Sequence, residues 1–126
     1  MKKLLILLFS ILVAFNSYGE WVLYGKNVDG ETHYIDFDTI KEHKGYVYWW
    51  HMSNYIKPNE FGYMSGELYI QGDCGINRMK YLSYSHSKQP MGERGETNNP
   101  PNPEWVYPSP GGSSDYELDL VCDYVK

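Results

Sequence analysis

The sequence predicts a small α+β fold: an antiparallel β-sheet of about five to six strands, with a C-terminal helix packed on it and tied to it by a disulfide. Three observations predict this. Short runs rich in Tyr, Val and Trp alternate with turn-forming residues between positions 20 and 86. An apolar stripe with helical spacing follows near the C-terminus. The chain has two cysteines, one in a turn of the expected sheet and one on the expected helix.

Residues 1–19 are expected to be a signal peptide that is removed after Gly19. Two lysines precede an almost unbroken apolar run, Leu4 to Phe15, and a short polar stretch follows; these are the three zones of a secretory signal. The run is shorter than the roughly 20 residues that cross a bilayer as a helix, and no cysteine lies near the cleavage point for lipid attachment. We therefore expect a single domain over 20–126, exported to the periplasm or to the cell surface and extracellular space, without a stable membrane anchor.

The composition of the chain excludes one class of partner. The 126 residues carry a formal net charge of -5, which becomes -7 without Lys2 and Lys3 of the expected signal peptide. Sequence-independent nucleic-acid binding needs a basic surface, so we expect no nucleic-acid partner. The hydrophobic content of 42%, with 17% aromatic residues, supplies enough apolar surface for one modest folded domain.

The first expected elements are a hairpin and a helical turn. The runs 20–26 and 32–37 are β-prone, and the Asp-Gly pair between them is a turn signal. Asp38 is expected to cap a helical turn over 39–42.

Residues 46–54 are expected to form a central strand, because Tyr, Val and Trp crowd there. Side chains alternate along a strand, so both faces of this one carry large apolar groups. One face is expected to hold Tyr46, Tyr48, Trp50 and Met52, and the other Val47, Trp49 and His51.

Two further strands, 67–71 and 78–86, are expected on either side of a turn over 73–77. The segment 87–113 then holds six of the seven prolines, and we expect it to be long and irregular. Trp105 is expected to pin it to the rest of the domain.

The last expected element is a short helix. Ser114 and Glu117 fit a capping box at its start. The apolar face of the helix is expected to hold Leu118, Val121, Cys122 and Val125.

Cys74 and Cys122 are expected to form a disulfide, because two cysteines in a small exported domain are more often bridged than reactive. By chain-entropy arithmetic such a bridge stabilises the fold by roughly 4 kcal/mol. A redox or zinc site is the weaker alternative, since the chain has no Cys-x-x-Cys.

No combination of residues in the sequence indicates catalysis, a cofactor or a metal. His33 and His51 could form a cross-strand pair that binds a metal or responds to pH, but two histidines are an incomplete ligand set, and we interpret them as half-buried strand residues. Asp36 and Asp38 are interpreted as turn formers rather than as an acid/base pair.

The surplus of aromatic residues is the most informative feature for function. A domain with one helix cannot bury both faces of an aromatic sheet, so some of these rings are expected to remain outside the core. Two interpretations stay open: the set only fills the core, or it fills the core and also forms a surface for protein binding or for self-association into a homodimer. The residues expected to bind a protein are Tyr48, Trp50, Glu93, Arg94, Trp105 and Tyr107.

The order of several landmarks resembles the bacterial surface-adhesin protein E family across nearly all of 20–126. The resemblance implies a small antiparallel sheet, a C-terminal helix held by a Cys74–Cys122 disulfide, and an envelope protein related to an adhesin for host proteins. The landmarks are Trp21, Tyr34-Ile35-Asp36, Gly45, Trp49, Trp50, Asp73-Cys74, Tyr81, Tyr84, Pro90-Met91-Gly92, Trp105, Pro108, Gly111 and Cys122.

The sequence therefore predicts a non-enzymatic, adhesin-like envelope or surface module that binds a host or envelope protein. The alternative is a periplasmic small-ligand carrier or sensor with an apolar pocket between sheet and helix.

Overall fold

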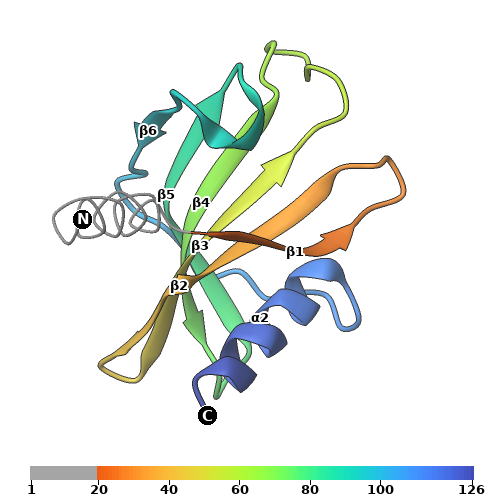
Figure 1. The fold of residues 1–126 in the computed structure, drawn as a ribbon. Helices are drawn as coiled ribbons and strands as arrows, with labels where there is room; N and C mark the ends of the chain where they lie inside the picture. Colours follow the sequence, from red (N-terminus) through yellow and green to blue (C-terminus); the bar gives the residue numbers. More distant parts are fainter. Residues whose placement is uncertain (1–19) are drawn as a thin grey trace, which may run out of the picture.

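The computed structural model describes residues 20–126, so the expected signal peptide lies outside the described residues. Six strands form one antiparallel sheet in chain order, and a helix lies against it (Figure 1). The predicted α+β fold with a C-terminal helix is confirmed. The strands are β1 (Trp21–Lys26), β2 (Thr32–His43), β3 (Tyr46–Asn54), β4 (Ser65–Asp73), β5 (Arg78–Ser87) and β6 (Glu96–Asn98); the helices are η1 (Pro90–Gly92) and α2 (Ser113–Tyr124).

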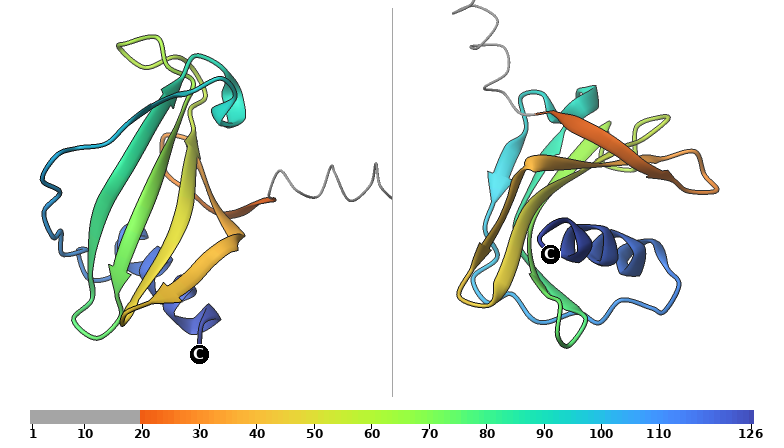
Figure 2. Two further views of the ribbon diagram at one scale, coloured as in Figure 1. Left: turned by 90° about the vertical axis from the view of Figure 1, so that its left-hand side faces the viewer. Right: turned by 60° about the horizontal axis from the view of Figure 1, so that its bottom comes forward.

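The sheet curves around α2, which lies in its concave face (Figure 2). The core between them is closed: Trp49 from the sheet and Leu118 from the helix have no exposed surface. Gly72 on β4 makes this contact possible, because a Cβ there would lie 2.8 Å from the Trp49 ring and 2.9 Å from Leu118. The core residues are Ile35, Val47, Trp49, Ile70, Met79, Leu118 and Val121.

The expected helical turn over 39–42 is wrong, because β2 continues through it to His43. The Thr39 hydroxyl donates to the backbone oxygen of Asp36, and the backbone N–H of Asp38 donates to the Asp36 carboxyl. The pairing with β3 shifts register between Asp36 and Lys41. Asp36 therefore organises a β-bulge, and strand pairing beyond it outweighs the local capping signal.

The alternation expected for β3 is confirmed. Val47, Trp49 and His51 are buried beneath α2, whereas Tyr48 and Trp50 on the outer, convex face are half-buried. Met52 also belongs to the outer face but has no exposed surface. It lies at the end of β3 that η1 contacts.

The predicted capping box at the start of α2 is wrong. The residue that precedes the helix is Gly112, with no side-chain cap, and the Asp115 carboxyl accepts from the backbone N–H of Gly111. The Glu117 side chain, 2% exposed, turns into the core instead. Its polar partners there, described below, outweigh a cap at the surface.

The proline-rich segment 87–113 is only partly irregular. It contains η1 and β6, which pairs with β5. Farther on, Val106 forms a backbone bridge with Met79 through N–O contacts of 2.9 and 2.7 Å. The segment therefore runs along the β5 edge and is attached at both ends.

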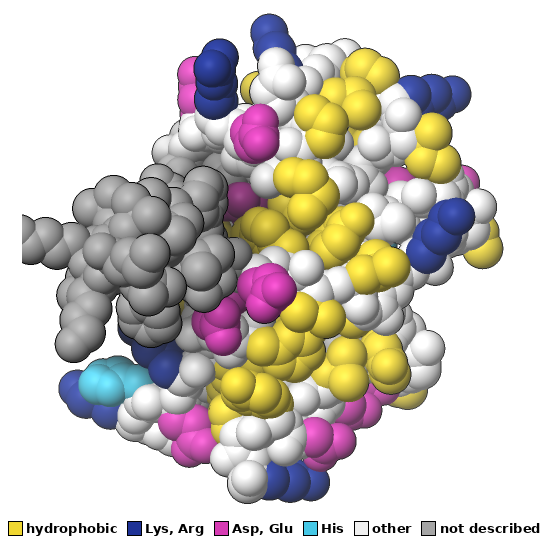
Figure 3. Space-filling model, in the orientation of Figure 1, with side chains coloured by type: hydrophobic (Ala, Val, Ile, Leu, Met, Phe, Trp, Pro, Cys, Tyr) yellow, Lys and Arg dark blue, Asp and Glu magenta, His cyan; other side chains and the backbone are white. Residues whose placement is uncertain are grey.

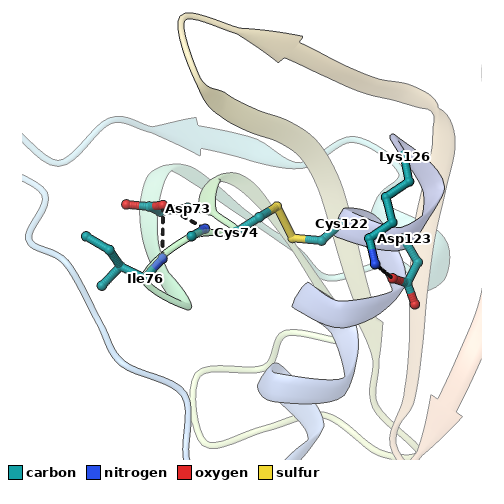
Figure 4. The surroundings of a disulfide bond; sticks show 7 residues. Asp73, Cys74, Ile76, Cys122, Asp123 and Lys126 are labelled. Carbon is teal, nitrogen blue, oxygen red and sulfur yellow. Dashed lines mark hydrogen bonds and ion pairs between the residues drawn. A yellow bond between two sulfur atoms is a disulfide. The ribbon is translucent and has the colours of Figure 1, made fainter.

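The predicted Cys74–Cys122 disulfide is confirmed, with a sulfur–sulfur distance of 2.07 Å (Figure 4). It joins the β4–β5 turn to the last turn of α2. Asp73 shapes the turn: its carboxyl accepts from the backbone N–H groups of Gly75 and Ile76 and from the Arg78 side chain. The disulfide thus holds the C-terminal end of the helix against one end of the sheet.

Candidate binding surface

Five half-buried rings lie on the outer face of the sheet, opposite α2. The centroids of Trp50 and Tyr69 are 5.0 Å apart, those of Tyr69 and Tyr48 are 6.2 Å apart, and those of Tyr46 and Trp105 are 5.5 Å apart. Alternation along β3 places three of these rings on the same face, and cross-strand pairing of Trp50 with Tyr69 adds the fourth. We call this set the outer aromatic face: Tyr46, Tyr48, Trp50, Tyr69 and Trp105.

Trp105 reaches this face from the proline-rich segment. The bridge between Val106 and Met79 fixes the segment beside β5. The Trp105 ring then packs against two cations: the guanidinium carbon of Arg78 lies 3.9 Å, and Nζ of Lys80 4.5 Å, from its centroid. Cation–π attraction of this kind contributes about 0.5–1 kcal/mol at partly exposed sites, so the two cations hold Trp105 in place.

A row of polar and aromatic side chains crosses four strands next to these rings. Lys41 pairs with Tyr48, Tyr48 with Gln71, and Gln71 with Lys80. The Gln71 amide donates to the Tyr48 hydroxyl at 3.2 Å. A shallow groove of about 350 Å³ lies at the Lys41 end of this row. Its walls are Lys41, Glu42, His43, Tyr48 and Tyr69.

The structure brings together three of the six residues predicted to bind a protein. Tyr48, Trp50 and Trp105 belong to the outer aromatic face, at the end of the sheet where β3 begins.

The other three predicted residues lie elsewhere. Glu93 and Arg94 are exposed and follow η1. η1 is attached to the opposite end of β3, because the Met91 backbone N–H donates to Asn54 at 2.7 Å. Tyr107 is 64% exposed and lines a cavity of about 310 Å³ beside β5 and the start of α2.

Sequence reasoning missed, as binding residues, two rings of the outer aromatic face, Tyr46 and Tyr69, and the two cations that pack against Trp105, Arg78 and Lys80. Alternation along β3 was a sufficient signal for Tyr46. The pairing of β3 with β4 and of β4 with β5, together with the position of Trp105, was needed for the other three, and no local pattern contains that information.

A buried polar cluster joins the concave face to α2. Nδ1 of His51 lies 2.6 Å from the Glu117 carboxyl, and the Trp49 indole N–H donates to the same oxygen at 3.4 Å. The Ser53 hydroxyl lies 2.8 Å from Nε2 of His51 and 2.8 Å from Nδ1 of His33. Every member therefore has a polar partner, as burial requires.

The Tyr24 hydroxyl also belongs to this cluster, because it lies 3.3 Å from Nδ1 of His51. Burial and charge shift the pKa values of two members. Burial raises the pKa of the Tyr24 hydroxyl well above its usual range, and the Glu117 carboxylate raises it further. Burial lowers the pKa of His33, and the neighbouring His51 lowers it again. Both groups are thereby held neutral at pH 7.

The two predicted strand histidines thus lie close together, with ring centroids 5.7 Å apart. Within residues 20–126, no group of three His, Cys, Asp or Glu side chains is placed to hold a metal ion. The cluster attaches the helix to the sheet.

The helix-bearing side of the molecule carries dispersed apolar side chains. Figure 3 shows them as a broken band from the β3–β4 loop to α2. Phe61 in that loop is 69% exposed, and Tyr116 and Tyr124 on the helix are 54% and 56% exposed.

A groove of about 430 Å³ lies beneath the proline-rich segment. It is lined by Leu68, Tyr81, Tyr84, His86, Pro100, Pro103, Glu104 and Val106.

Residues 21–123 match the family described as surface-adhesin protein E. The chain belongs to the surface-adhesin protein E family. Membership supports a surface, adhesin-like role and a protein without catalytic activity. The match includes the β1 strand, the outer aromatic face and the disulfide.

A solved structure, that of Haemophilus influenzae protein E, has a similar fold. The structure of crystal form II of Haemophilus influenzae protein E aligns with a TM-score of 0.62 at 18% identity, over 84% of this chain and 90% of that chain. At this identity the likeness shows the fold alone. No curated protein sequence shows significant similarity to this member of the adhesin E family. Among residues 20–126, no helix is long and apolar enough to cross a membrane.

Proposed function

We propose that this member of the adhesin E family is exported by a signal peptide at 1–19, and that it acts in the envelope or at the cell surface as a non-enzymatic module that binds a host or envelope protein. The observation that supports this best is the outer aromatic face. Five large rings lie side by side on the face that the helix does not cover.

The rings are not required to complete the core. The core fills the concave face, where Trp49, Ile70 and Leu118 exclude solvent. An antiparallel sheet with one covered face normally presents a polar opposite face. Tyr, Trp and Arg are the residue types that contribute most to binding energy at protein interfaces, and all three types occur here.

The buried contact between His51 and Glu117 supports this assignment over an enzyme. Glu117 and His51 have the chemistry of an acid/base pair, but they are 2% and 7% exposed and bonded to each other. A substrate therefore has no access to them in this arrangement.

A photo-cross-linking experiment tests the proposal. The photoreactive residue p-benzoylphenylalanine replaces Tyr48 on the outer aromatic face. The producing cell expresses and exports this variant, and the cells are irradiated with and without added host extracellular-matrix proteins. We expect a covalent adduct with a second, different protein. The adduct should weaken strongly when Trp50→Ala and Trp105→Ala are added.

Two controls check that the adduct is specific to the outer aromatic face and that the variants are folded. The same photoreactive residue at Tyr124 on the helix tests whether any exposed ring gives the same adduct. Circular dichroism checks that the Trp variants remain folded. No adduct at Tyr48, adducts only between copies of the chain, or equal adducts at both positions would contradict the proposal; the second result would instead identify a homodimer surface.

The groove beneath the proline-rich segment favours a second candidate function, the binding of a small apolar ligand. The space between sheet and helix, where such a pocket was expected, is filled by core side chains, whereas this groove of about 430 Å³ is within the usual size of ligand sites. Native mass spectrometry of the protein purified without detergent tests it. A bound mass that is lost in Leu68→Trp would support ligand binding, and the bare protein mass alone would contradict it.

A further inference from the structure

We propose that the outer aromatic face binds an extended acidic segment of its protein partner, in which two carboxylate side chains stand four residues apart with an apolar side chain midway between them. This inference rests on the proposed function and specifies the chemistry of the partner. Three features of the face support it: its charge, the arrangement of its cations and the distance between them.

The first feature is the presence of two lysines outside any described salt bridge in an acidic protein. The full chain has a net charge of -5, yet Lys41, Arg78 and Lys80 all lie next to the rings of this face. Among the described residues, Arg78 is paired with Asp73, whereas Lys41 and Lys80 are in no salt bridge. Further carboxylates lie close to these residues: Glu42 lines the groove, and Asp36, the cross-strand partner of Trp50, is buried. The face therefore attracts an anionic partner, and such complementarity directs both encounter and orientation.

The second feature is the way Trp105 fixes two cations next to each other. Arg78 and Lys80 are two residues apart on β5, so they point to the same side, and both lie within 4.5 Å of the Trp105 centroid. The contact orders the flexible Lys80 stem before any partner arrives. A carboxylate that binds there meets a preorganised cation and loses less entropy than at a free lysine.

The third feature is the distance between the two unpaired lysines. Lys41 and Lys80 lie at the ends of the row that crosses β2, β3, β4 and β5. Neighbouring strands are about 4.8 Å apart, so three steps span roughly 14 Å. An extended peptide advances about 3.3 Å per residue, and side chains four residues apart point to the same side at roughly 13 Å. The two distances agree.

The middle of the row selects the residue between the two acids. A side chain halfway along the segment would lie over Tyr48 and Gln71, beside Tyr69, where a leucine-sized group covers ring surface. An acidic glycan with a charge on every sugar would place anions over those rings. Aromatic faces are electronegative and repel anions, so the face favours a polypeptide with spaced carboxylates.

Binding of synthetic peptides to the purified protein tests the inference. The probe is the amide-capped heptapeptide Gly-Glu-Ser-Leu-Ser-Glu-Gly, and binding is followed by tryptophan fluorescence and amide NMR shifts at low salt. We expect shifts at Tyr48, Gln71 and Lys80, and weaker binding at high salt. A peptide with both Glu replaced by Gln should bind at least about fivefold more weakly, the effect of an ion pair worth about 1 kcal/mol.

Substitutions in the protein and a spacing change in the peptide complete the design. Lys41→Gln and Lys80→Gln should each weaken binding by about fivefold, whereas the matched control Lys57→Gln, in the exposed β3–β4 loop, should leave it unchanged. In the isomeric peptide Gly-Glu-Leu-Glu-Ser-Ser-Gly the two acids are only two residues apart, so the peptide can contact only one of the two lysines at a time. It should therefore also bind about fivefold more weakly than the probe.

Several results would overturn the inference: equal binding of both peptide spacings, no response to either lysine substitution, or tighter binding of a sulfated tetrasaccharide than of the acidic heptapeptide. These results differ from a failure of the proposed function. If cross-links from Tyr48 to a partner persist unchanged in Lys41→Gln/Lys80→Gln, the surface binds a protein by other chemistry; if no cross-links form at all, the surface itself is wrong.

Discussion

Nδ1 of His51 on β3 lies 2.6 Å from a carboxylate oxygen of Glu117 on α2, and the two residues are 7% and 2% exposed. The Trp49 indole shares the same carboxylate oxygen. The disulfide holds the C-terminal end of the helix, whereas this polar contact acts in its N-terminal half. The helix is therefore attached to the concave face at two points of different chemistry.

The first prediction concerns the loss of this contact. Glu117→Ala leaves the His51 and Trp49 N–H groups without their acceptor in a buried site. We expect the free energy of unfolding to fall by at least about 2 kcal/mol, because each unsatisfied buried group costs about 1–3 kcal/mol. Denaturant unfolding at pH 7 measures it. The control Asp119→Ala, on the exposed side of the same helix, should change stability by less than about 0.5 kcal/mol; similar losses in both variants would contradict the prediction.

The second prediction concerns acid. Burial, and then the nearby His51, lower the pKa of His33, so the folded state binds the His33 proton less readily than the unfolded state does. The stabilisation is therefore complete above the unfolded value of about 6.5 and is lost as the pH falls toward the folded pKa. We expect the free energy of unfolding to decrease between about pH 7 and pH 5, and His33→Gln to reduce that slope. The control His43→Gln, at an exposed position, should leave the slope unchanged. If His33→Gln also leaves it unchanged, the loss of stability in acid comes from other titratable groups.

The sequence predicted the elements whose signals are local and repeated. Alternation along 46–54 predicted both the bounds and the two faces of β3, and helical spacing placed Leu118 and Val121 in the core. The two failures have one cause. Asp38 and Glu117 carry local capping signals, but pairing with β3 extended β2 past Asp38, and the buried His51 and Trp49 drew Glu117 inward.

The candidate surface was only partly predictable for the same reason. Tyr48 and Trp50 lie on one strand, so their common face follows from alternation. Trp105 joins them only because Val106 pairs with Met79, a contact between residues far apart in the sequence. Arg78 and Lys80 pack against the Trp105 ring, so their place beside the surface also depends on the pairing of Val106 with Met79.

The third prediction tests the close approach of the sheet and helix. In Gly72→Ala, the new methyl group would lie 2.8 Å from the Trp49 ring and 2.9 Å from Leu118. We expect a loss of about 1–3 kcal/mol from overpacking, measured by thermal and denaturant unfolding. Gly25→Ala in β1 is the matched control, because its Cβ would meet no atom within 4 Å. Equal stability of the two variants would show that the core accommodates the methyl group by repacking.

The last prediction concerns the disulfide, whose Cys74 is exposed and whose Cys122 is half-buried. The bridge closes a loop with a sequence separation of 48, and restricting the unfolded chain to that extent stabilises the fold by about 4 kcal/mol. Treatment with a phosphine reductant should therefore lower the free energy of unfolding by about this amount and release the C-terminal end of α2 first, because the contact of Glu117 with His51 still holds the other half. Cys74→Ser/Cys122→Ser should match the reduced protein and should not respond to the reductant. Amide hydrogen exchange distinguishes the two ends of the helix. In the reduced protein we expect faster exchange around Val121 than around Leu118. Uniform protection along α2 would show that the polar contact and the core hold the whole helix without the disulfide.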